Sequence, residues 1–257
     1  MKIPHSKIIG SGSNHLIILH GLLGMGDNWK TIANKLSEYD YKIHLLDQRN
    51  HGKSFHSNIM NYDVMTLDVY NYLNHKKINK CDILGHSMGG KVAINFSLYY
   101  SEFVRKMIIV DIAPRQYEPK FNYLFEIMSN LDLANLNSRS EIQNKLNLEI
   151  TNKSLVLFLL KNISRDNNNQ FKFKPNIDIL HKSLIILMDQ IYIYKKININ
   201  TTFIKGEKST YIHDSDVIFI NNYFKNSQLI EIKNSGHWVH SENPKDFLSS
   251  LIHIFNN

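Results

Sequence analysis

The sequence has one cysteine, no long hydrophobic run and no apolar leader. The single Cys81 excludes an intrachain disulfide, and its apolar neighbours indicate a small buried side chain rather than a reactive thiol. The longest apolar stretches, such as Leu155–Leu160 and Leu184–Met188, are far shorter than the ~18–20 residues that span a bilayer, so we expect no membrane insertion. The first residues, MKIPHS, lack the hydrophobic core of a secretory signal. We therefore expect a cytoplasmic protein.

Clusters of like charge are also absent, although the formal net charge is +7. Proteins that bind nucleic acid usually concentrate lysine and arginine on one face or in one run. In this chain the lysines are scattered, with no run of five or more basic residues, and we expect no nucleic-acid partner. The positive sign is nevertheless suited to attracting anionic substrates, such as acyl thioesters of phosphate-bearing carriers.

Cofactor motifs are missing as well. No G-x-G-x-x-G fingerprint occurs, which argues against a dinucleotide cofactor. His237 and His240 are three residues apart, but no third ligand lies near them in the sequence, which argues against zinc. We therefore expect neither a cofactor nor a metal ion. We expect the substrate to be a small molecule and the protein to be a monomer or a weak homodimer.

The chain that remains has the composition of a folded domain, with 43% apolar and 21% charged residues among 257. Short apolar runs alternate with helical periodicity, which indicates an α/β fold with a mostly parallel sheet and helices on both faces. The expected strands are Leu16–Leu19, Ile43–Leu46, Cys81–Leu84, Met107–Val110, Thr202–Ile204 and Leu229–Ile232. The expected helices cover about 28–37, 62–74, 88–99 and 214–224, and a last one begins at Asn243-Pro244.

Residues 115–196 differ from the rest of the chain. No glycine occurs between Lys91 and Lys205, and the pattern is helical throughout this segment, apart from an Asn- and Lys-rich stretch, Arg165–Lys174, that indicates an exposed loop. Ser138 and Glu141 have capping-box spacing. A helix after Pro175 would have an inner face of Ile177, Leu180, Leu184, Leu187 and Ile191. We expect a core of residues 1–114 and 197–257, with 115–196 inserted as a helical lid.

The strongest chemical signal is the pentapeptide GHSMG at 85–89. It fits the G-x-S-x-G nucleophile elbow, in which a serine stands on a sharp turn between a strand and a helix. The two glycines are needed because the residues on either side of the serine approach each other closely. The expected strand before and helix after this motif favour Ser87 as a nucleophile over a serine in an ordinary glycine turn.

A second signal, HGLLG at 20–24, directly follows the first expected strand. Such a loop supplies one backbone N–H of an oxyanion hole, from Leu22, while Met88 supplies the other. We interpret His20 as structural rather than catalytic. Leu23 and Met25 are candidates to line the pocket, and Trp29 is a candidate for either the pocket or the core.

A third signal, SGHW at 235–238, lies between the last expected strand and the last helix. Histidine titrates in the range that a general base requires. The chain has 13 histidines, and His237 is selected by its position in the order nucleophile, acid, base. The glycine before it is expected to let the loop turn toward Ser87.

The order and spacing of these motifs, together with DQRNHGKS at 47–54, resemble the α/β-hydrolase superfamily. The combination of GLLG with DNW at 27–29, VDIAP at 110–114 and HWVH at 237–240 resembles the YbfF-type bacterial esterases and their mitochondrial relatives. The resemblance implies an α/β-hydrolase fold with a helical lid inserted after the sixth strand, and a small acyl esterase or thioesterase. Within the 47–54 loop, we expect Asp47 and Arg49 to brace the turn beneath the active site.

The sequence offers more than one position for the acid of the triad. In most members of the superfamily it lies three residues after Gly206, where this chain has Ser209. The YbfF-type pattern places the acid at Asp111, where it would fix the tautomer of His237, with Ser209 adding a second hydrogen bond. Other candidates are Glu207, Asp214 and Asp216.

The expected reaction is acyl transfer to Ser87, followed by hydrolysis of the acyl-enzyme, with an ester or a thioester as substrate. A serine at position 87 disfavours a dehalogenase, which needs aspartate there. A carbon–carbon hydrolase, a synthase-type lyase and an esterase for the methyl ester of a carrier-bound acyl chain remain as alternatives. A catalytically idle fold that only binds a ligand is an alternative from another class.

Overall fold

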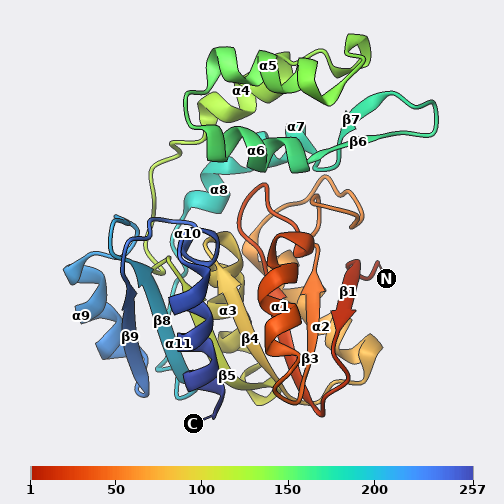
Figure 1. Ribbon diagram of the computed structural model, residues 1–257. Coiled ribbons are helices and arrows are strands. Elements are labelled where there is room, and N and C mark those ends of the chain that lie inside the picture. Colours follow the sequence, from red (N-terminus) through yellow and green to blue (C-terminus); the bar gives the residue numbers. More distant parts are fainter. Residues whose placement is uncertain (1, 257) are drawn as a thin grey trace.

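The computed structural model describes residues 2–256 and has a seven-stranded sheet at its centre (Figure 1). The strands lie in the order β1-β3-β2-β4-β5-β8-β9, with β1 antiparallel to β3 and every other neighbouring pair parallel. Their bounds are β1 (Ser6–Ile9), β2 (Asn14–Leu19), β3 (Tyr41–Leu46), β4 (Cys81–His86), β5 (Val104–Val110), β8 (Asn200–Gly206) and β9 (Ser227–Ile232). The predicted α/β class with a mostly parallel sheet is confirmed.

Helices cover both faces of this sheet. One face packs against η1 (Gly26–Trp29), α1 (Lys30–Leu36) and α11 (Pro244–Asn256). The other packs against α2 (Tyr62–Lys76), α3 (Met88–Tyr99) and α9 (Asp214–Tyr223), and a short turn η2 (Ser101–Phe103) precedes β5. All six residues of β4 are buried, because a central parallel strand is covered on both sides and its apolar run does not alternate with polar residues.

The segment between β5 and β8 lies above the carboxyl ends of the parallel strands (Figure 1). Its elements are α4 (Asn122–Asn130), η3 (Leu133–Asn135), α5 (Arg139–Glu149), α6 (Lys153–Lys161), β6 (Ile163–Arg165), β7 (Phe171–Phe173), α7 (Ile177–Lys182) and α8 (Leu184–Met188). Ser138 caps α5 by accepting the amide of Glu141, as predicted. All five residues of the predicted inner face after Pro175 are buried, although Ser183 divides the helix into α7 and α8.

Three expectations about this region were wrong. The segment follows the fifth strand in chain order, not a sixth, because only one antiparallel strand, β1, precedes the parallel run that starts with β2. It is not helical throughout, and Arg165–Lys174 is not a plain loop, since β6 and β7 pair as an antiparallel hairpin. Phe171 anchors that hairpin: its ring is buried and lies 3.9 Å from the guanidinium of Arg165. The sequence pattern also missed β1 and the short helix α10 (Val239–Glu242).

Lys91 joins the core to this upper segment. It lies on α3 with only 1% of its surface exposed, and its Nζ donates to the backbone oxygens of Asp189 at 2.6 Å and Met188 at 3.3 Å. The ring centroids of Tyr62 and Tyr117 lie 5.8 and 4.7 Å from the ammonium. Burial lowers the pKa of Lys91 to about 7, although the nearby Asp189 carboxylate opposes this shift.

This shift predicts a stability that depends on pH. The pKa of an unfolded lysine is about 10.4. Between pH ~7 and ~10 the unfolded chain therefore holds the proton that folded Lys91 has lost. The contribution of Lys91 to the free energy of unfolding should therefore rise with pH in that window. We expect urea unfolding to show a larger stability gain from pH 7 to pH 9 in the wild type than in Lys91→Met. The exposed Lys153→Met is the control and should keep the gain.

Candidate active site

Ser87 stands at the turn between β4 and α3, with φ 52° and ψ −120°. The flanking glycines allow this turn. A Cβ on Gly85 would lie 2.2 Å from the backbone oxygen of Gly89, and one on Gly89 would lie 2.2 Å from the oxygen of Leu19. The predicted close approach around the serine is thus confirmed, and the strained backbone presents the Ser87 hydroxyl at the carboxyl edge of the sheet.

His237 and Asp111 meet Ser87 from two other strand ends. His237 follows β9 and Asp111 follows β5, and parallel strands bring their carboxyl ends to one edge. The His237 Nε2 lies 3.1 Å from Ser87 Oγ, and its Nδ1 lies 2.7 Å from Asp111 Oδ2. The three side chains therefore form one continuous chain of hydrogen bonds.

Asp111 is fully buried and held by several donors. Besides His237, Oδ2 accepts the hydroxyl of Ser209 at 2.5 Å, and Oδ1 accepts the amide of Gly206 at 3.1 Å. Its φ of 52° lies in the left-handed region, which aspartate tolerates better than most residues. The other acid candidates lie elsewhere: Glu207 contacts Lys233, Asp216 pairs with Arg115, and Asp214 is exposed at the start of α9.

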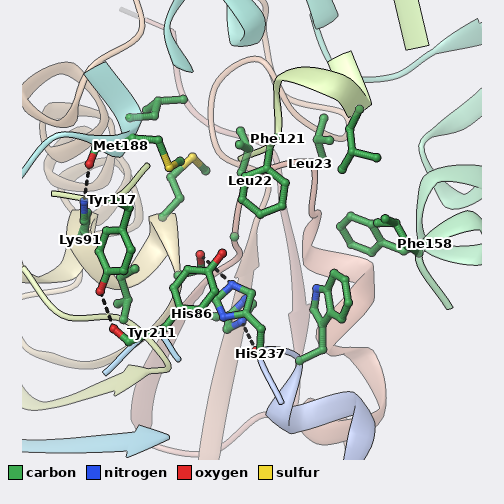
Figure 2. Close-up of a pocket in the computed structure, with 18 of the residues that line it drawn as sticks. Leu22, Leu23, His86, Lys91, Tyr117, Phe121, Phe158, Met188, Tyr211 and His237 are labelled. Carbon is green, nitrogen blue, oxygen red and sulfur yellow. Dashed lines mark hydrogen bonds between the residues drawn. The ribbon is translucent and has the colours of Figure 1, made fainter. Parts of the chain in front are cut away.

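Two aromatic side chains that the sequence did not single out fix the His237 ring and its loop (Figure 2). Tyr211 stacks on the ring with centroids 3.7 Å apart and planes inclined by 16°. His86 Nε2 lies 2.9 Å from the backbone oxygen of His237 and acts as the donor. Burial holds the pKa of His86 well below its usual value, so the ring is neutral. Because aromatic stacking has no sequence signature, only the tertiary structure identifies Tyr211.

The glycine before His237 does not have the role that we expected. A Cβ on Gly236 would meet only the Glu242 carboxylate, at 3.2 Å, and Gly236 does not have a positive φ. The close approach occurs at Gly206, where a Cβ would lie 2.2 Å from the Gly236 oxygen. The requirement for glycine thus belongs to the end of β8, over which the 235–236 backbone passes.

Leu22 and Met88, the two residues expected to form the oxyanion hole, line one cavity together with Ser87. Neither amide donates to an acceptor within residues 2–256, although only 3% of the surface of Met88 is exposed. Buried backbone N–H groups are nearly always hydrogen-bonded. Two free donors beside a serine are therefore available to a ligand oxygen.

The cavity at Ser87, which we call the inner cavity, is small and mostly apolar (Figure 2). Its volume is about 40 Å³. Residues from the upper segment close it from above, namely Phe121, Leu124, Leu155, Phe158, Leu187 and Met188. Leu23 lines it as expected, but Met25 does not and is buried elsewhere.

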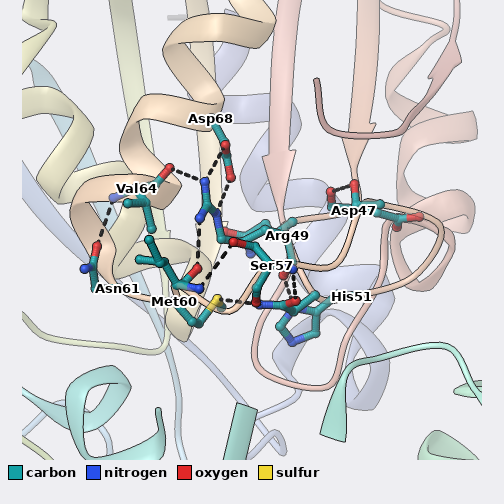
Figure 3. Close-up of polar contacts among 12 residues, drawn as sticks. Asp47, Arg49, His51, Ser57, Met60, Asn61, Val64 and Asp68 are labelled. Atoms are coloured by element: carbon teal, nitrogen blue, oxygen red, sulfur yellow. Dashed lines mark hydrogen bonds and ion pairs between the residues drawn. The ribbon is translucent and has the colours of Figure 1, made fainter. Parts of the chain in front are cut away.

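His20 and the 47–54 loop support the site from below. His20 is buried, its Nε2 accepts the amide of Gln48 at 3.0 Å, and its Nδ1 lies 2.8 Å from the oxygen of Gly21. Arg49 pairs with Asp68 at 2.6 and 2.8 Å (Figure 3). Asp47 accepts the amides of Gly26 and Lys53 at 2.7 and 2.8 Å. These contacts brace the loops that follow β2 and β3. None of the side chains of His20, Asp47 and Arg49 lines the inner cavity.

Within 2–256 there is no group of three or more His, Cys, Asp or Glu side chains placed to hold a metal ion. Over the same residues, no helix has the length and hydrophobicity to cross a membrane. Cys81 is buried, and burial raises the pKa of its thiol.

Comparison with known proteins agrees with this architecture. A family model described as the alpha/beta hydrolase fold matches residues 14–244. The chain belongs to the α/β-hydrolase family. This hydrolase is 32% identical to the sn-1-specific diacylglycerol lipase ABHD11 of Danio rerio, over 98% of this chain and 82% of that protein. It is 27% identical to the esterase YbfF of Escherichia coli, over 94% of this chain and 92% of that protein.

Among solved structures, one called a marine microorganism esterase superposes with a TM-score of 0.96 at 36% identity. The superposition covers 98% of this chain and 99% of that one. The predicted resemblance to the superfamily, and within it to YbfF-type esterases, is therefore confirmed.

Proposed function

We propose that this hydrolase is a serine esterase that cleaves carboxylic esters through an acyl-enzyme on Ser87. The observation that carries the proposal is the continuous hydrogen-bond chain from Ser87 Oγ through His237 to Asp111, in contacts of 3.1 and 2.7 Å. Relatives called esterase and lipase support the same class of substrate.

In the first half of the reaction, His237 Nε2 takes the proton of the Ser87 hydroxyl while Oγ attacks the ester carbonyl. Asp111 holds the proton on Nδ1, so that Nε2 presents its lone pair, and stabilises the imidazolium that forms. The amides of Leu22 and Met88 donate to the oxyanion. Each such donor contributes about 3–4 kcal/mol in comparable sites. The imidazolium then gives its proton to the departing alcohol.

In the second half, water attacks the acyl-enzyme and His237 takes one of its protons. The same amides stabilise the second oxyanion, and Ser87 is released with its proton restored by His237. A thioester follows the same steps with a thiol as leaving group, so the machinery by itself does not favour an oxygen ester over a thioester.

We further propose that residues 115–196 act as a lid, and that the remainder, 1–114 and 197–257, is the catalytic core. Side chains of α4, α6 and α8 cover the inner cavity, where the acyl chain would lie. An open volume of about 40 Å³ is close to that of one water molecule in liquid water, about 30 Å³. Acyl chains beyond the smallest should therefore fit only if the lid moves, and longer chains should need a larger movement.

The test is the hydrolysis of p-nitrophenyl esters from acetyl to palmitoyl, together with labelling by a fluorophosphonate probe. We expect one covalent adduct, on Ser87, and a kcat/KM that is higher for acetyl and butanoyl than for palmitoyl. A folded protein that takes no label and cleaves no ester would instead indicate a binding fold without catalysis. Label without ester cleavage would point to a narrower substrate, such as the ester of a carrier-bound acyl chain.

A further inference from the structure

A second cavity, which we call the outer cavity, lies between α6 and the loops after β2 and β9. Its volume is about 590 Å³, against about 40 Å³ for the inner cavity. The two share the lining residues Gly21, Leu22, His86, Phe158 and Trp238. In Figure 2, Phe158 lies on the opposite side of His237 from Lys91 and Tyr117, which line only the inner cavity. The proposed catalytic site therefore adjoins two spaces of different size.

The outer cavity is more polar than the inner one. Ser154 and Lys161 reach it from α6, and His240, Ser241 and Glu242 reach it from α10. The Glu242 carboxylate is already engaged within its own loop, because it accepts the amide of Gly236 at 2.6 Å. The other polar groups thus remain as candidates for binding a ligand.

His240 is the buried member of this group. It is 9% exposed, and its ring stacks on Trp29 with centroids 4.0 Å apart and planes inclined by 17°. Its Nδ1 has no hydrogen-bond partner within residues 2–256. Burial lowers the pKa of His240 to about 3, so the neutral ring offers one N–H and one lone pair. Nδ1 is shielded from solvent, so the ring nitrogen that a ligand in the outer cavity can reach is Nε2, which also has no hydrogen-bond partner within residues 2–256. Since polar atoms of buried residues are usually satisfied, this free nitrogen suggests a ligand that pairs with it.

The proposed chemistry indicates which part of the substrate would lie there. The general base returns its proton to the leaving group, so the leaving group departs on the His237 side of the scissile bond. Trp238 follows His237 in the chain and lines both cavities. A leaving group more than a few atoms long would pass Trp238 into the outer cavity, toward the His240 ring, which is 5.2 Å from that of His86.

We propose that the outer cavity binds the leaving group of the substrate, and that His240 selects leaving groups that carry a hydroxyl or an amide. This inference rests on the proposed esterase function and adds a specificity-determining residue to it. The inner cavity holds the acyl group, and the outer cavity distinguishes polar from apolar alcohols or thiols.

The experiment compares two esters of butanoate that differ only in two hydroxyls, the propyl and the glyceryl ester. We expect the wild type to prefer the glyceryl ester about tenfold in kcat/KM, the effect of one added hydrogen bond. In His240→Phe, which retains an aromatic ring against Trp29, this ratio should fall to near one. Because the readout is a ratio, a loss common to both esters does not affect it.

His240→Gln keeps a hydrogen-bonding side chain and should recover part of the preference. His75→Phe removes an exposed histidine on α2 and should leave the ratio unchanged. Ser154→Trp tests the cavity from the exposed side of α6, independently of the buried ring. By narrowing the cavity, it should slow the glyceryl ester more than the propyl ester.

A second pair, the S-propyl and S-(N-acetylcysteamine) thioesters of butanoate, shows whether the preferred polar group belongs to an alcohol or to an amide-bearing thiol. A wild-type ratio near one in both pairs, or a ratio that persists in both His240→Phe and Ser154→Trp, would overturn the proposal. Propyl butanoate hydrolysis that Ser87→Ala abolishes would still support the esterase. Failure to cleave any of the four substrates would overturn this proposal, and the esterase with it if the fluorophosphonate probe also fails to label Ser87.

Discussion

Ser87→Ala should lower kcat by about a million-fold, the loss seen when a triad serine is removed from an enzyme of this mechanism. In the proposed mechanism Ser87 Oγ attacks the ester carbonyl, and no other hydroxyl lies within hydrogen-bond distance of His237 Nε2 among the described residues. Alanine keeps the Cβ of serine, so the φ of 52° at this position is no more strained than before. The measurement is kcat for p-nitrophenyl butanoate, with the midpoint of thermal unfolding as a check on folding.

Ser250→Ala is the matched control. Ser250 lies on α11 and its hydroxyl donates to the backbone oxygen of Asp246, far from the inner cavity. Its activity should equal that of the wild type. If Ser87→Ala were folded and retained more than about a thousandth of the wild-type kcat, the nucleophile would have to be another group, and the proposed acyl-enzyme would be wrong.

Asp111→Asn should lower kcat by about ten-thousand-fold with little effect on folding. The asparagine carbonyl can still accept the amide of Gly206, and asparagine tolerates the left-handed φ of this position. Its NH₂ group would then face Nδ1 of His237. That contact favours the tautomer with the proton on Nε2, which cannot accept the proton of Ser87.

Ser209→Ala separates the carboxylate from its supporting hydrogen bond. Asp111 would lose the hydroxyl contact of 2.5 Å but keep His237 and the Gly206 amide. We expect a loss of only about tenfold, the effect of one hydrogen bond. Equal losses in Ser209→Ala and Asp111→Asn would show that position 209 matters as much as the carboxylate. Near-normal activity in Asp111→Asn would require another acid.

Much of the fold could be predicted from local patterns. The strands that pair in the middle of the sheet are apolar runs, and the helices between them have clear periodicity, so α3 was predicted with its observed bounds, Met88–Tyr99. The misses lie where local pattern is weak. β1 is a short edge strand with exposed residues, and β6 and β7 have only three residues each, too few for the alternation in Phe171–Phe173 to indicate a strand.

The residues of the candidate site also fall into two groups, those that sequence motifs indicate and those that only the packing of distant segments brings together. Ser87 could be chosen from the nucleophile-elbow motif and His237 from its place in the chain order, while Asp111 came from the resemblance to the YbfF-type pattern, with other acids left open. Tyr211, Lys91 and His240 could not, since their surroundings come from segments distant in sequence. Tyr211 stacks on a histidine 26 residues later in the chain, a contact that no spacing rule predicts.

The sequence by itself thus determined the class of fold, the candidates for nucleophile and base, and the two glycines that the turn at Ser87 requires. These features depend on strand periodicity and backbone sterics, which act over a few residues. Only the tertiary structure decided that Asp111 rather than Glu207 contacts His237, which glycine the loop over β8 needs, and that two cavities meet at Trp238. Those outcomes depend on how distant strand ends and the 115–196 segment pack together, because packing fixes the distances between side chains that the chain order leaves open.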